Sequence, residues 1–241
     1  MKHFNILLLS LILLTTTLYS QDNINLFPQS SIYIERDFFT LSYNEENEQA
    51  NWVYYKLDKK ILSGKAQRKN NFKEDQRIIT GSAKLTDYKG SGFDRGHLCP
   101  AGSMKISQKA IDETFYMSNM SPQNPSFNRG VWKKLEGLIR DWVYKYGELI
   151  VVTGPIFDEK MSSIGNSEVS VPNFFYKVIY ALEGQGKMIG FILPNKKSND
   201  QLINFSVTVD EVELISGLNF YHKLDDKIED FLESEIGGFS F

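Results

Sequence analysis

The 241-residue sequence predicts a single domain of mixed α and β structure. Hydrophobic residues make up 41% of the chain and aromatic residues 13%, which is typical of a globular protein with a substantial core. Strand-like and helix-like patterns are both present, and the sequence shows no internal repeat, linker or low-complexity tract. We therefore expect one domain over residues 21–241.

The strand candidates are short segments rich in β-branched and aromatic residues. They are residues 32–34, 38–43, 51–57, 148–153, 174–182 and 187–193. Helices are expected over residues 107–115, 128–146 and 225–235. In the second helix, apolar residues recur at helical spacing and Gly147 follows as a stop signal. The periodic residues are Val131, Leu135, Leu138, Trp142 and Tyr146.

Residues 1–20 have the features of a secretory signal peptide. Lys2 and His3 precede an apolar run from Phe4 to Leu14, and the small residue Ser20 stands before Gln21. The apolar run is too short for a typical membrane-spanning helix. We expect export, into a periplasm or out of the cell, and no stable membrane association after signal removal. An uncleaved N-terminal anchor is the alternative.

The cysteine and histidine content argues against a structural zinc site. Cys99 is the only cysteine, so no intrachain disulfide can form. After signal removal, Cys99, His97 and His222 are the only thiol and imidazole side chains, whereas zinc sites need a cluster of them. We expect Cys99 to be a small buried apolar residue, with a redox-sensitive thiol as the alternative.

Charge is distributed unevenly along the chain. The formal net charge is −3, whereas a general nucleic-acid binder is usually basic. Seven basic residues lie between Lys56 and Lys73, and nine acidic residues lie between Asp210 and Glu235. The basic run would attract phosphates while the acidic run keeps the protein soluble. Alternatively, both runs are ordinary solvated faces.

The segment from Asp94 to His97 (DRGH) concentrates groups that suit phosphodiester cleavage. A histidine can take a proton from water near neutral pH, and an arginine can meet negative charge on phosphoryl oxygens. If this segment is a strand, Arg95 and His97 point to the same face. The alternative for His97 is a structural histidine with satisfied hydrogen bonds.

A second polar cluster precedes the long predicted helix. Four amide side chains lie within ten residues, namely Asn119, Gln123, Asn124 and Asn128. Helix capping or loop hydrogen bonding would explain them without function. However, Mg²⁺ takes oxygen ligands and keeps most of its waters, so one amide oxygen and a nearby Glu136 would hold it.

Together the two clusters resemble the DNA/RNA non-specific endonuclease family, which has the His-Me finger (ββα-metal) fold. The motifs are DRGH, then the segment from Ser118 to Glu136 (SNxxPQxxxFNxGxWxxLE), with TGP at 153–155 and Pro172-x-x-x-Tyr176-Lys177 downstream. Upstream, Arg68-x-x-x-Phe72-x-x-Asp75 is a looser match. The resemblance implies an α+β fold with a mixed, mainly antiparallel central sheet flanked by helices.

The resemblance also implies roles for the site residues. His97 would be the general base, and Asn128 the one direct ligand of a magnesium ion whose other positions are held by water. Glu136 would hold one of those waters, and Asn119 would arrange the site around the base. Manganese is an alternative ion.

Substrate contacts follow from the same resemblance. Arg95 and Arg68 would contact the scissile phosphate, and Gln123 would support the substrate-binding loop. Arg140 lies one turn after Glu136 and would pair with it or face substrate. Lys177 would orient the acidic residues or reach the substrate backbone, or it would be a solvent-facing strand lysine.

The expected activity is magnesium-assisted, in-line hydrolysis of DNA and RNA that leaves 5′-phosphate ends. Contacts to phosphates rather than to base edges or 2′-hydroxyls would make the enzyme indifferent to the sugar. Three alternatives stay open: a catalytically weak nucleic-acid-binding protein on this fold, a DNase-type toxin, and a phosphodiesterase for small substrates.

Overall fold

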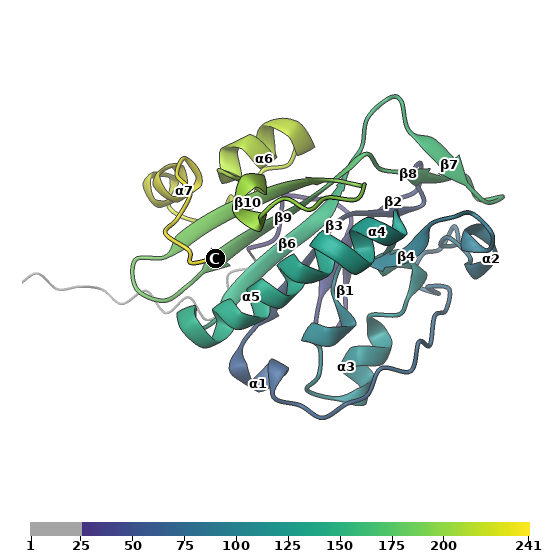
Figure 1. The fold of residues 1–241 in the computed structure, drawn as a ribbon, viewed down its shortest axis with the longest axis horizontal. Coiled ribbons are helices and arrows are strands. Elements are labelled where there is room, and N and C mark those ends of the chain that lie inside the picture. Colours follow the sequence, from purple (N-terminus) through teal and green to yellow (C-terminus); the bar gives the residue numbers. More distant parts are fainter. Residues whose placement is uncertain (1–25) are drawn as a thin grey trace, which may run out of the picture.

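A seven-stranded sheet forms the centre of the computed structural model, which describes residues 26–241 (Figure 1). The expected signal peptide, residues 1–20, lies outside the described residues. The strand order is β1-β2-β3-β6-β9-β10-β11, and each neighbouring pair is antiparallel. The bounds are β1 (Ile34–Glu35), β2 (Thr40–Asn44), β3 (Gln49–Leu57), β6 (Leu149–Ile156), β9 (Phe174–Ala181), β10 (Lys187–Pro194) and β11 (Ser206–Val207). All six expected strands are present, with ends shifted by a few residues.

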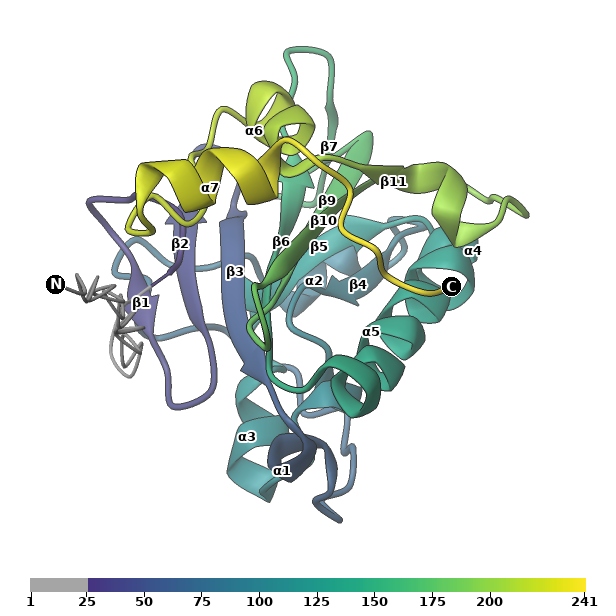
Figure 2. The same cartoon turned by 90° about the vertical axis from the view of Figure 1, so that its left-hand side faces the viewer.

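Helices cover both faces of this sheet (Figure 2). The long helix α5 (Lys133–Tyr146) packs on one face, and α6 (Val209–Ser216) and α7 (Asp226–Glu233) pack on the other. The remaining helical segments are α1 (Lys59–Leu62), α2 (Leu85–Tyr88), α3 (Gln108–Glu113), α4 (Pro125–Phe127), η1 (Ala101–Ser103), η2 (Met117–Asn119), η3 (Asn128–Trp132) and η4 (Leu202–Phe205). The mixed α+β class with an antiparallel sheet is therefore confirmed.

Helix α6 was not predicted, although the sequence contains its start signal. Thr208 and Glu211 form a capping box in which each side chain binds the other residue's backbone N–H. Glycine ends both α5 and α6: Gly147 has φ +73°, and Gly217 lies in the left-handed region at φ +69°. Gly147 was the expected stop.

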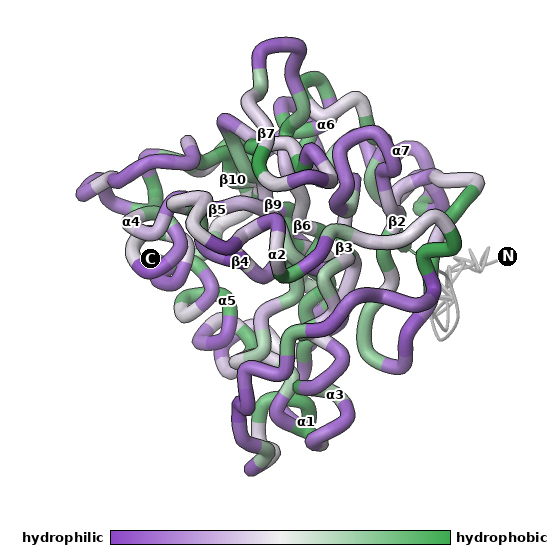
Figure 3. The backbone as a smooth tube through the Cα atoms, turned by 90° about the vertical axis from the view of Figure 1, so that its right-hand side faces the viewer, coloured by the Kyte–Doolittle hydropathy of each residue, from purple (hydrophilic) through white to green (hydrophobic). Residues whose placement is uncertain are grey.

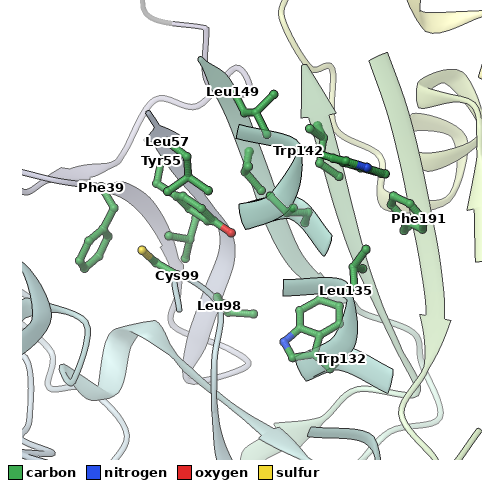
Figure 4. Close-up of a cluster of buried hydrophobic side chains, with 14 of the residues drawn as sticks. Phe39, Tyr55, Leu57, Leu98, Cys99, Trp132, Leu135, Trp142, Leu149 and Phe191 are labelled. Carbon is green, nitrogen blue, oxygen red and sulfur yellow. The ribbon is translucent and has the colours of Figure 1, made fainter. Parts of the chain in front are cut away.

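Strand alternation divides the core into two layers. On β9, Phe175 and Ile179 face α5, whereas Tyr176 and Val178 face α6 and α7. Figure 4 shows the α5 layer, where Trp132 and Trp142 pack with Cys99 and Tyr55. Apolar residues concentrate in the central strands, and the peripheral loops are mostly hydrophilic (Figure 3). Both tryptophans and Cys99 are fully buried, as expected for core residues.

Two small antiparallel sheets flank the central one. Strand β7 (Ser162–Ile164) pairs with β8 (Val169–Val171), and β4 (Asp94–His97) pairs with β5 (Met120–Gln123). The chain leaves β5 through α4 and η3 directly into α5. The segments β4, β5 and α5 therefore form the expected ββα unit, on the α5 side of the sheet (Figure 1).

Candidate active site

The DRGH segment forms strand β4, and its alternation sets the direction of the Arg95 and His97 side chains. Arg95 and His97 are two residues apart and both contact Phe72: the Arg95 guanidinium lies 4.1 Å from the ring centroid, and the His97 ring 5.8 Å. Opposite them on β5, Gln123 lies over Gly96, where an added Cβ would stand 2.1 Å from Gln123 Cδ. A side chain larger than that of glycine at position 96 would therefore collide with Gln123.

His97 is held in a mainly apolar environment. It is only 7% exposed, its ring meets Phe115 edge to face at 4.8 Å, and its Nε2 atom is enclosed without a hydrogen-bond partner among the described residues. Burial, with smaller contributions from the positive charges of Arg68 and Arg95, lowers the pKa of His97 to about 3. The imidazole is therefore neutral across the physiological pH range.

Asn128 is not the N-cap of a helix, since Phe127 and Trp132 precede η3 and α5. Asn124 has that role, because its side chain accepts a hydrogen bond from Ser126 N–H and Pro125 follows it at the first helical position. Asn128 instead begins the segment η3, in which Gly130 has non-helical φ −105° and ψ −111° and produces a kink before α5.

Asp94 fixes the Asn128 amide. The Asn128 Nδ2 group donates to Asp94 Oδ2 at 2.9 Å, and Arg129 binds both oxygens of the same carboxylate, at 2.9 and 2.6 Å. Arg129 and Asn128 hydrogen bonds hold the pKa of Asp94 below its usual range against the effect of burial. Because the Nδ2 group of Asn128 donates to Asp94, its Oδ1 atom remains available as an acceptor that can bind a cation.

Glu136 lies two turns further along, on α5, and faces a buried lysine. Burial raises the pKa of Glu136, and the nearby charges of Lys177, Arg140 and Arg68 oppose that rise. Lys177 is fully buried, so the solvent-facing alternative is wrong. Its Nζ lies 3.2 Å from Thr153 Oγ1 and 4.2 Å from the centroid of the Trp132 ring, and burial lowers its pKa to about 8.

Arg95, Asp94, Asn128 and Glu136 line one cleft with a volume of about 780 Å³, whereas the buried His97 and Lys177 are not among its lining residues. Five cationic residues line it, and Asp94 and Glu136 are its acidic lining residues. The cations are Arg68, Arg95, Arg129, Lys133 and Arg140. Of the basic run from Lys56 to Lys73, Arg68 alone is among the residues that line the cleft. The cationic cleft is assembled from three separate segments instead.

Asn119 and Gln123 lie behind this cleft rather than in it. Asn119 is fully buried, and its amide binds only backbone: Cys99 N and O, and Thr114 O, at 2.8–3.0 Å. It therefore positions the chain that follows His97 and does not reach substrate. Gln123 is also fully buried against Gly96, which does not fit the expected substrate-binding role.

Several residues that line the cleft were not predicted from the sequence. Arg129, Lys133 and Asn70 line the cleft, and Phe72 separates Arg95 from His97. Asn70 accepts a hydrogen bond from Arg68 Nε at 2.6 Å, and the Arg68 guanidinium lies 5.2 Å from the Phe115 ring centroid. Arg129 directly follows Asn128 in the motif from Ser118 to Glu136. Its position next to the expected metal ligand could have indicated that Arg129 lies at the site.

The oxygen atoms of the cleft suit a hard divalent cation. Asn128 Oδ1 and the Glu136 carboxylate are oxygen donors, whereas Asp94 is already bound by Asn128 and Arg129. A small number of protein oxygens is what Mg²⁺ needs, because it retains several waters. The cleft lining contains no cysteine or histidine, which disfavours zinc.

A buried neutral histidine lies on one of two paired strands, β4 and β5. The helical segment that follows carries an amide and a carboxylate that line one cationic cleft. This arrangement defines a nuclease of the ββα class. The chain belongs to the DNA/RNA non-specific endonuclease family, whose family model matches residues 20–227. The expected family and the endonuclease activity are therefore confirmed: the protein hydrolyses the backbone of nucleic acids.

Individual relatives agree with this assignment. The chain is 40% identical to Nuclease C1 of Cunninghamella echinulata var. echinulata over 211 residues, which cover 80% of this chain and 84% of that protein. It is 35% identical to human mitochondrial endonuclease G over 77% of this chain and 68% of that protein. A solved structure of the EndoG/EndoGI complex matches with a TM-score of 0.77 and 33% identity, covering 83% of this chain and 90% of that one.

Proposed function

We propose that this endonuclease uses one magnesium ion held through Asn128 to cut both DNA and RNA without selecting the sugar, and that it acts outside the cytoplasm. The main support for the metal proposal is the hydrogen bond from Asn128 Nδ2 to Asp94. This bond occupies the amide nitrogen, so the amide oxygen is available to bind a cation. Manganese is the second ion that the same oxygens would accept.

His97 is the proposed general base. Its Nε2 atom is enclosed, so Nδ1 is the nitrogen that takes the proton from the attacking water. A base must be unprotonated to act, and the lowered pKa of His97 keeps it so. The water then attacks phosphorus in line with the leaving 3′ oxygen, which leaves a 5′-phosphate end.

Arg95 and Arg68 are the proposed phosphate contacts. Both line the cleft, and both lie against the aromatic residues that enclose His97, at 4.1 Å from Phe72 and 5.2 Å from Phe115. Stacking on a ring restricts a guanidinium while its N–H groups remain free to bind phosphoryl oxygens. Their charge stabilises the oxygens that become more negative as the bond breaks.

Asn128 and Glu136 are the proposed metal-holding residues, with Glu136 acting through water. When bound, magnesium would supply positive charge at the leaving oxygen. The positive charge of Lys177 opposes the effect of burial on the pKa of Glu136 and favours the carboxylate form of that side chain. Arg140 interacts electrostatically with the same carboxylate from the cleft side.

Sugar indifference follows from the composition of the cleft. The five cations of the cleft are suited to phosphates, which DNA and RNA share, and contacts to phosphates do not distinguish the two sugars. The described residues contain no helix long and apolar enough to cross a membrane. Export rests on residues 1–20 and is tested by N-terminal sequencing of the protein recovered outside the cytoplasm; a start near Gln21 is the expected result.

The metal proposal is tested by titrating Mg²⁺ into a DNA-cleavage assay. Asn128→Ala is expected to shift the Mg²⁺ requirement upwards by at least 10-fold, because it removes the proposed ligand oxygen. The matched control is Asn219→Ala, an exposed asparagine outside the cleft, which should titrate as wild type. An unchanged Mg²⁺ midpoint in Asn128→Ala, or full activity in EDTA, would overturn the proposal.

A further inference from the structure

Three carboxylates meet on the sheet face opposite the catalytic cleft. Asp210 and Glu213 belong to α6, and Glu233 is the last residue of α7. One carboxylate oxygen from each lies within 4.8 Å of the other two. The two helices pack on the opposite side of the sheet from α5, so this cluster is not part of the nuclease site (Figure 2).

Glu233 is the unusual member of the cluster. It is only 3% exposed, and its Oε1 atom is enclosed without a hydrogen-bond partner in the described chain. Beside it, the Tyr221 hydroxyl is likewise buried and unpartnered, and it lies near enough for the Glu233 carboxylate to raise its pKa. A buried carboxylate directed at two others, with no compensating donor, costs several kcal/mol unless it is neutralised.

In the part of the chain that the structure describes, no cation is paired with the cluster. None of the ion pairs among residues 26–241 involves Asp210, Glu213 or Glu233. Glu213 Oε1 accepts a hydrogen bond from Phe220 N at 2.6 Å, which fixes that carboxylate in place. The cluster therefore brings together three acceptor groups without a paired cation, and a bound metal ion would satisfy them.

We propose that Asp210, Glu213 and Glu233 form a structural binding site for a hard divalent cation, of which Ca²⁺ is the best match. All three donors are carboxylate oxygens, and Ca²⁺ takes six to eight oxygen ligands in irregular geometry. Mg²⁺ is less suited because it requires near-ideal octahedral coordination and loses its waters reluctantly. Asp210 is exposed, so a cation can enter from solvent and keep waters as its remaining ligands.

The proposed ion would link the C-terminal helix α7 to helix α6. Helix α7 contributes Glu233, and α6 contributes the other two ligands, so a bound cation bridges the helices. Both helices cover the second core layer through Val209, Val212 and Leu232. Binding would therefore stabilise this layer without changing the catalytic cleft.

The test measures Ca²⁺ binding and stability rather than nuclease activity. Thermal unfolding and isothermal titration with Ca²⁺, and separately with Mg²⁺, are performed in an Asn128→Ala background so that the catalytic cleft does not contribute. Ca²⁺ at about 100 times its Kd is expected to raise Tm by roughly 5–10 °C, with one ion bound per chain. Glu233→Gln, which keeps the side-chain shape, should abolish both effects.

The matched control is Glu235→Gln, which removes the same charge from an exposed position two residues away. It should bind Ca²⁺ as the parent does. The proposal is overturned if Ca²⁺ neither binds nor shifts Tm in the parent, or if Glu233→Gln binds it unchanged. Tm measured in EDTA shows whether each variant is folded, because a folded Glu233→Gln variant without Ca²⁺ response is the supporting result.

Discussion

At the residue scale, the protonation state of His97 is determined by the residues around it rather than by the ordinary pKa of histidine. An ordinary imidazole has a pKa near 6.5, whereas burial between Phe72 and Phe115, beside two arginines, lowers the pKa of His97 to about 3. The sequence identified His97, Arg95 and Arg68 as neighbours in function. It could not show that aromatic rings pack between them, because Phe72 and Phe115 come from segments far from β4 in the chain.

The lowered pKa of His97 predicts how stability depends on pH. The unfolded chain takes up a proton on His97 below about pH 6.5, whereas the folded chain does so only near pH 3. Stability that is present above pH 6.5 is therefore lost as pH falls from 6.5 towards 3, on the order of a few kcal/mol for this residue. Urea unfolding at several pH values measures it.

The comparison that isolates this contribution is His97→Gln, which does not titrate. Its unfolding free energy should fall less steeply than that of the wild type between pH 6.5 and 4. Equal slopes for both proteins would show that His97 titrates normally in the fold.

Lys177 provides a second prediction at this scale. In Lys177→Met the Glu136 carboxylate loses the positive charge that opposes its burial, so its pKa should rise further. Because a protonated carboxyl is a poor partner for a metal-bound water, we expect a 10- to 100-fold loss of activity near neutral pH. The loss should diminish as pH rises.

Mg²⁺ titrations of Lys177→Met at pH 7 and pH 9 distinguish this role from a packing role. A deficit of the same size at both pH values would indicate that Lys177 serves only to fill the core. Methionine matches the length of the lysine stem, which limits the change in packing.

At the element scale, the site depends on the pairing of β4 with β5 and on the kink at Gly130 before α5. The segment from Ser118 to Glu136 was predicted to lie at the site, and the long helix was predicted over residues 128–146. The sequence did not reveal that η3 interrupts the regular helix, or that Asp94 holds Asn128 across a gap of 34 positions in the chain. Periodicity reports one face of a helix, and such long-range side-chain pairs leave no periodic signal.

Gly96 tests the pairing of β4 with β5. An added Cβ would stand 2.1 Å from Gln123 Cδ, so Gly96→Ala should destabilise the fold by about 1–3 kcal/mol. Chemical denaturation measures the loss.

Gln123→Ala in the same chain removes the atoms that the new methyl group would meet. The double variant should therefore be less destabilised than the sum of the two single variants. Strict additivity would show that the two side chains do not compete for the same space.

At the scale of the whole molecule, charge is separated by the central sheet. The acidic run from Asp210 to Glu235 forms α6, α7 and their flanking segments on one face, whereas the cationic cleft lies on the α5 side. The sequence predicted the acidic segment and the single-domain α+β fold. It did not reveal the cationic cleft, because the cations that line it come from three separate segments and converge only after folding.

The cationic cleft predicts strong salt dependence despite the net charge of −3. Each phosphate contact contributes about −0.9 to the slope of log affinity against log salt for duplex DNA. Arg129 already binds Asp94, so Lys133→Ala is the cleaner test of a lining cation. It should weaken DNA binding and reduce the slope by roughly one, whereas Lys227→Ala, an exposed lysine on α7, should not change it. Binding measured in EDTA from 50 to 300 mM salt tests this.

The most direct test of the account is the digestion of supercoiled plasmid and of a long RNA by wild type and by His97→Ala, with magnesium and with EDTA. We predict that wild type degrades both polymers with magnesium and neither in EDTA. His97→Ala should be slower by about 10²–10⁴-fold on both. Equal rates for wild type and His97→Ala, or cleavage of both polymers in EDTA, would contradict the assignment of His97 as the base of a metal-assisted nuclease.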